Sequence, residues 1–192
     1  MIKKFNLISK KISIYKIIFY LFSFLFIIFF SYFLTPNFFN YSSLLVEESF
    51  KINNNINIKN ISKISYEIFP TPRLKVYGSN LNIKKNILEI DGSEIEIILN
   101  LDSILNYKKI YYKKIIIKGG STKINVNNIT QLLNYFKKNK LKIFLKKNNF
   151  IFKEDNEFLF EINNSTAEIS SSNNRQQLNI NGIFLNHKIN FL

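Results

Sequence analysis

The stretch Ile17–Leu34, with the sequence IIFYLFSFLFIIFFSYFL, is eighteen residues long and contains no charged side chain. At ~1.5 Å rise per residue, an α-helix of this length covers roughly 27 Å, which is close to the hydrocarbon thickness of a bilayer. Apolar side chains occupy all of its faces, unlike those of an amphipathic surface helix. The stretch therefore predicts a helix that spans a membrane.

Two other interpretations of this stretch remain open. A cleaved signal peptide shares the basic start, but it has a shorter apolar core and small residues at the cleavage site, whereas bulky aromatic residues interrupt Ser31–Phe39. A buried helix of a soluble protein rarely stays uncharged over such a length. We favour an uncleaved membrane anchor.

The charges on the two sides of the stretch predict its orientation. Glu47 and Glu48 are the first charges after it, and five lysines precede it, namely Lys3, Lys4, Lys10, Lys11 and Lys16. Lys and Arg next to a span resist translocation. We expect a basic cytoplasmic leader over residues 1–16, a transmembrane helix over 17–34 and a body outside the cytoplasm.

Composition argues against several classes of function. The net charge is +14, but five positive charges flank the span and the remainder is almost all Lys, whereas nucleic-acid recognition favours the arginine fork. Cys is absent and His187 is the only His, so a thiolate metal site or a histidine-based catalytic triad has no residues to build it. We expect no nucleic-acid partner, no catalytic residue, no metal and no cofactor, and His187 on the surface.

Residues 35–51 follow the span and predict a juxtamembrane amphipathic helix. Pro36 fits the first turn of a helix, and apolar residues then recur near helical spacing up to Phe50. This helix would lie near the outer membrane surface or cap the next domain.

From residue 52 to 192 the apolar period changes to two, which is typical of half-buried strands. Gly78 and Asp91–Gly92 interrupt the pattern, and the parity of the apolar positions shifts after Gly92. One amphipathic helix is expected over Asn128–Lys138. The fold class predicted is mainly β: an N-terminal transmembrane helix followed by a curved antiparallel sheet, an open groove or incomplete barrel, with two short helices that cannot cover it. The chain stops on a strand pattern at Lys188–Leu192, so we expect a fragment or a short member of something longer, with an exposed edge strand.

The stretch Ile64–Gly120 resembles the N-terminal part of the AsmA-like family. The resemblance rests on Ile64–Val76 (ISYEIFPTPRLKV) with its Phe-Pro turn, on Leu101–Leu105 (LDSIL), and on the strand that closes at Gly119–Gly120. It covers roughly residues 15–120. The chain departs from the family in having Asn53–Asn55 where members usually have Gly, and most members are several times longer.

This resemblance implies anchoring in the bacterial inner membrane, a periplasmic body over residues 52–192, a groove-forming sheet and no enzymatic activity. Members of the family act in outer-membrane biogenesis, and some carry phospholipid between membranes. We expect a lipid-handling protein whose partner is membrane phospholipid, held by a groove lined by Ile64, Tyr66, Ile68, Leu74, Val76, Ile95, Ile97, Leu99 and Leu101.

Three alternatives stay open at this point. The nine residues would otherwise form a closed core. The body would otherwise dock envelope proteins by strand addition at its free edge without binding lipid. An acid–base enzyme is the weakest alternative, because Glu94 and Glu96 alternate with the apolar positions and are expected to face water.

Overall fold

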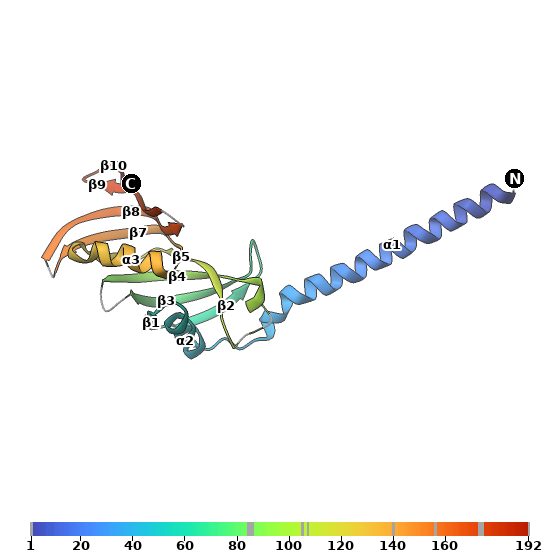
Figure 1. The fold of residues 1–192 in the computed structure, drawn as a ribbon, viewed down its shortest axis with the longest axis horizontal. Helices are drawn as coiled ribbons and strands as arrows, with labels where there is room; N and C mark the ends of the chain where they lie inside the picture. The colour runs from blue at the N-terminus through green and yellow to red at the C-terminus, as the bar shows by residue number, and fades with distance from the viewer. Residues whose placement is uncertain are drawn as a thin grey trace.

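The computed structural model describes residues 2–83, 87–104, 106, 108–139, 141–155, 157–172 and 175–191, with side chains from Ile14 onward except 171–177 and 191. The fold is mainly β, as predicted, with an N-terminal apolar helix and one large sheet (Figure 1). The helices are α1 (Ile2–Leu34), α2 (Ser43–Asn54) and α3 (Ile129–Asn139), with short 3-10 helices η1 (Thr35–Phe38), η2 (Leu101–Ser103) and η3 (Val126–Asn128). The strands are β1 (Ile56–Lys59), β2 (Lys63–Glu67), β3 (Arg73–Ile83), β4 (Leu88–Leu99), β5 (Tyr112–Lys118), β6 (Ser121–Asn125), β7 (Ile143–Glu154), β8 (Glu157–Ser172), β9 (Arg175–Phe184) and β10 (His187–Phe191). The predictions that involve Lys84, Leu105 and Leu192 lie outside the described residues.

Helix α1 projects away from the body of the protein (Figure 1). It ends at Leu34 as predicted, but it begins at Ile2, so the basic leader is part of the same helix. The segment Ile14–Phe38 is long and apolar enough to span a membrane. None of the 18-residue apolar stretch within it is buried against the rest of the chain.

The helix predicted over residues 35–51 begins later than expected. Pro36 is buried and lies in the one-turn η1, and residues 39–42 are not helical. The Ser42 hydroxyl accepts a hydrogen bond from the Leu45 N–H at 3.3 Å and caps α2, which closes at Asn55 in the left-handed region. Val46 and Phe50 are completely buried, so α2 caps the sheet.

The sheet is mixed rather than purely antiparallel. Its strand order is β1-β3-β4-β5-β7-β8-β9-β10, with β2 beside β3 and with β6 between β4 and β7. Strand β7 runs parallel to β5 and β6, while the other ladders are antiparallel. The reason is the predicted helix, which is confirmed as α3: it lies between β6 and β7 and returns the chain to the start of a parallel strand.

A line of extra residues crosses the sheet from β3 to β8, and we call this line the crease. It is formed by Gly78, Ser93, Gly119–Gly120, Lys147 and Asn164, all of which except Ser93 have a positive φ. On each strand the buried positions change parity there; in β3, for example, the even positions Leu74 and Val76 are buried before the crease and the odd positions Leu81 and Ile83 after it. Because all these strands shift at the same level, their apolar residues stay on one face of the sheet on both sides of the crease.

Small side chains and local hydrogen bonds hold the crease together. The Asn148 side-chain amide, which is completely buried, donates to the Gly119 carbonyl at 3.0 Å. The Gly119 N–H donates to the Lys146 carbonyl, and the Asn149 N–H to the Gly120 carbonyl. A Cβ on Gly120 would lie 1.8 Å from the Asp91 carbonyl oxygen, so only glycine allows β4 and the β5–β6 junction to approach this closely.

The apolar face of the sheet forms the core under α2 and α3. Phe50 of α2 stacks on Tyr112 with ring centroids 5.0 Å apart, and Leu132 and Phe136 of α3 are buried in the same cluster. The two helices meet at Asn54, whose backbone carbonyl accepts a hydrogen bond from the Tyr135 hydroxyl. This face, which we call the inner face, is thus covered by helices over its central strands.

Replacing Gly120 by Ala should destabilise the protein by more than about 2 kcal/mol, because the new Cβ meets backbone and the residue has a φ of +88°. The matched control is Gly78→Asn, since asparagine tolerates a positive φ and the nearest atom to a Cβ there is the movable Ser62 hydroxyl. Urea unfolding of the full chain in detergent measures both. Equal midpoints for Gly120→Ala and the unmodified chain would contradict a rigid crease.

Candidate functional site

The structure divides the nine residues predicted to line a groove into three groups. Leu74, Val76, Ile95, Ile97 and Leu99 are buried in the core beneath the helices. Ile64, Tyr66 and Ile68 are half-buried near the end of α1. Leu101 was predicted to continue the apolar row of β4, but the strand ends at Leu99. Leu101 lies in η2 with 54% of its surface exposed.

The five buried residues therefore share no open surface. Over β3 and β4, which carry these residues, the apolar face is closed: α2 and α3 contribute to the same core and meet where the Tyr135 hydroxyl donates to the Asn54 carbonyl. The alternative of a closed core describes this part of the sheet.

The opposite, outer face carries a chain of ion pairs at the α1 end of the sheet. The Arg73 guanidinium lies 2.9 Å from Glu96 Oε2, and Lys118 Nζ lies 2.6 Å from Glu96 Oε1 and 2.9 Å from Glu94. Lys75 pairs with Glu67 at 2.7 Å. Three acids and three bases thus neutralise one another across four adjacent strands.

The prediction that Glu96 faces water is wrong, since only 3% of its surface is exposed. It does lie on the outer face, but it is paired with Arg73 and Lys118 and lies opposite Ile116 in the ladder with β5. Burial alone raises the pKa of the Glu96 carboxyl, but the hydrogen bonds and charges of Lys118 and Arg73 outweigh burial and hold this pKa below its ordinary value. The hydrogen bond to Glu96 raises the pKa of Lys118 in turn. A carboxylate that is ionised and fully paired stabilises structure and is a poor general base.

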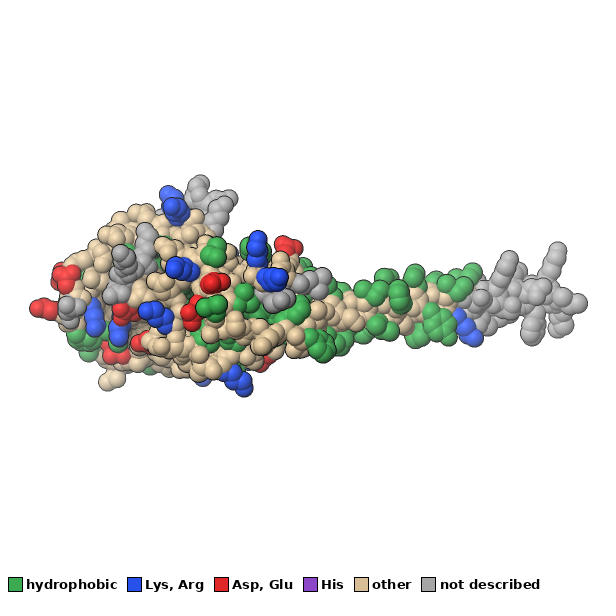
Figure 2. All heavy atoms as spheres, turned by 90° about the horizontal axis from the view of Figure 1, so that it is seen from below, with side chains coloured by type: hydrophobic (Ala, Val, Ile, Leu, Met, Phe, Trp, Pro, Cys, Tyr) green, Lys and Arg blue, Asp and Glu red, His purple; other side chains and the backbone are tan. Residues whose placement is uncertain are grey.

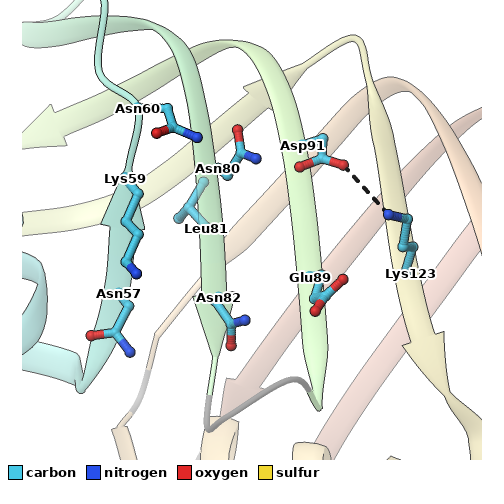
Figure 3. A pocket seen from close by; sticks show the side chains of 9 residues that line it. All are labelled: Asn57, Lys59, Asn60, Asn80, Leu81, Asn82, Glu89, Asp91 and Lys123. Atoms are coloured by element: carbon cyan, nitrogen blue, oxygen red, sulfur yellow. Dashed lines mark ion pairs between the residues drawn. The ribbon is translucent and has the colours of Figure 1, made fainter. Parts of the chain in front are cut away.

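A polar hollow of about 620 Å³ lies on the outer face beyond the crease (Figure 3). Side chains of β1, β3, β4 and β6 and of the turn after β1 surround it, and Lys123 Nζ lies 3.8 Å from Asp91. Its lining is rich in amides: Asn57, Lys59, Asn60, Asn80, Leu81, Asn82, Glu89, Asp91 and Lys123. In the described part of the chain, no three His, Cys, Asp or Glu residues are grouped so that they could hold a metal ion.

An apolar hollow of about 470 Å³ lies at the end of the sheet away from α1. Strands β7 and β8 extend past the β9–β10 hairpin here (Figure 1). The described ladder between β8 and β9 begins at Asn163, so residues 157–162 of β8 pair with β7 alone in the part of the chain that the structure describes. Phe158 and Leu159 of β8 and Leu185 of the hairpin turn are 62%, 43% and 76% exposed. We call residues 157–162 the open edge.

The open edge is the feature that sequence reasoning missed. The sequence placed a free edge at the last strand, and β10 does end the strand order. This edge arises because β8 has 16 residues and β9 only 10, a difference that the structure alone shows. His187 is exposed on β10, as predicted.

Comparisons with protein-family models, with curated proteins and with solved structures give no match.

Replacing Glu96 by Gln should destabilise the chain by about 3 kcal/mol, because Arg73 is left buried without its counter-charge. Glu94→Gln is the matched control; its side chain is 24% exposed, and the loss should stay below about 1 kcal/mol.

The same pair of variants predicts a pH dependence. Because folding lowers the pKa of Glu96, its contribution is fully present above the ordinary value of 4.5 and is lost as the pH falls from there through the lowered pKa. Unfolding curves of the unmodified chain and Glu96→Gln should therefore converge in acid. A difference in the free energy of unfolding between the two proteins that stays constant down to the lowest pH would show that the ionised carboxylate is not the stabilising group.

Proposed function

We propose that this protein is a single-pass inner-membrane protein of the bacterial envelope, with residues 17–34 of α1 in the membrane and the basic leader in the cytoplasm. The body would stand in the periplasm and dock an extended segment of an envelope protein at the open edge of β8. The exposed, uncharged residues 17–34 of α1 and the five lysines before them support the anchor.

The stretch of β8 that pairs only with β7 among the described residues, 157–162, carries the docking part of this proposal. A strand with one free side presents backbone N–H and C=O groups that another extended chain can pair with. Exposed apolar side chains on both faces of the open edge, Phe158 on one and Leu159 on the other, would bury the partner's alternate side chains. The partner is therefore expected to be an extended segment with apolar residues on both of its faces.

Lipid handling within the sheet has less support from the geometry. Five of the nine proposed lining residues lie in a core covered by helices. Phospholipid photocrosslinked from the half-buried Ile64 or Ile68 would favour lipid handling over docking.

Photocrosslinking from the intact cell envelope tests the docking. A photoreactive phenylalanine analogue at Phe158 or Leu159 should capture one protein in stoichiometric yield, because both side chains flank the open edge. The control is the analogue at Ile52 of α2, which is 80% exposed and lies outside the open edge. It should capture none. With the purified partner, amide hydrogen exchange over residues 157–162 should slow by at least tenfold. Equal capture from Ile52, or unchanged exchange at the open edge, would contradict the proposal.

A further inference from the structure

The end of α1 is fastened to the body at two points. The Tyr32 hydroxyl donates to the Leu101 carbonyl at 2.8 Å, and the Tyr66 hydroxyl donates to the Phe33 carbonyl at 3.0 Å. Pro36 is buried directly after the helix. These contacts hold η2 and the end of β2 beside the last turn of α1, so the position of the helix also sets the position of these loops.

Exposed apolar side chains gather at this junction. Phe69, in the turn between β2 and β3, is 75% exposed, and Phe38, Leu101 and Tyr111 are 87%, 54% and 42% exposed. Figure 2 shows hydrophobic side chains where the body meets α1 and onward along the helix. We call Phe38, Phe69, Leu101 and Tyr111 the proximal rim.

The rim has the composition of a membrane interface rather than of a protein-binding patch. Hydrophobic side chains run on from it along α1 (Figure 2), and Tyr, Phe and Leu are side chains that proteins place at the boundary between headgroups and acyl chains. The segment between Leu101 and Tyr111 adds exposed Lys108 and Lys109 against a single acid, Asp102. Cations so placed attract anionic lipid headgroups.

We propose that the proximal rim lies in the interfacial layer of the same bilayer that α1 spans, with Phe69 and Leu101 inserted at the headgroup boundary. This inference rests on the membrane anchoring proposed above and adds a second contact with lipid. Tyr32, two residues before the end of α1, lies at this boundary and carries Leu101 with it. The body then stands on the membrane in one orientation, with the open edge of β8 pointing away from it.

Single-tryptophan fluorescence tests the rim, because the chain contains no Trp and each substitution supplies the only one. The variants are Phe69→Trp and Leu101→Trp in the rim, Phe26→Trp in α1, and Phe158→Trp at the far end as the matched control for an exposed Phe. Each full chain is reconstituted in vesicles of phosphatidylethanolamine and phosphatidylglycerol whose acyl chains are brominated near the headgroup end. The two rim variants should lose fluorescence and emit at shorter wavelength, whereas Phe158→Trp should keep the emission of a water-exposed indole.

The Phe26→Trp variant separates failure of the rim from failure of the anchor. This variant is measured in a second set of vesicles, whose acyl chains are brominated at the middle. If its fluorescence is quenched there while Phe69→Trp and Leu101→Trp match Phe158→Trp in the first set, the anchor stands and the rim is overturned. If Phe26→Trp is not quenched either, the proposed anchoring fails and the rim falls with it. Agreement between the two rim positions guards against misfolding of one variant.

Discussion

The crease is the constraint on which the rest of the body depends. A strand that gains one residue turns all its later side chains to the other face, so a single bulge in one strand would split the core. Here β3, β4, the β5–β6 junction, β7 and β8 all gain a residue at the same level, and their apolar residues stay together. Gly120 is the tightest point, because backbone of β4 fills the space of its missing Cβ.

This shared shift leaves the exposed apolar surface of the body at the ends of the sheet. The inner face is apolar on both sides of the crease, and α2 and α3 cover its centre. The outer face is neutralised by the ion pairs around Glu96 at one end and carries an amide-rich hollow at the other. Exposed apolar surface remains at the junction with α1 and at the open edge of β8, which are the two contacts proposed for lipid and for a protein partner.

The sequence predicts elements better than it predicts what covers them. Hydrophobic length predicted the end of α1 at Leu34, and helical spacing predicted α3 almost to the residue, because both signals are local. In the sequence Gly78 interrupts the strand pattern and the parity shifts after Gly92, but Lys147 and Asn164 make the same shift without glycine and give no signal. Glu96 was placed in water because alternation reports the face of a strand, whereas its burial depends on Arg73 and Lys118 from other strands. The same limit applies to the groove, since only tertiary packing reveals that α2 and α3 lie over it.

The central claim is that one rigid, creased sheet has a closed inner face and an open edge on β8. Residue-resolved amide hydrogen exchange on the full chain in detergent micelles tests this claim most directly. We predict the slowest exchange in β4 and β7 on both sides of the crease, and fast exchange at those amides of residues 157–162 that do not pair with β7. Fast exchange through β4 at Ile95–Leu99, with protection of the whole of residues 157–162, would contradict it.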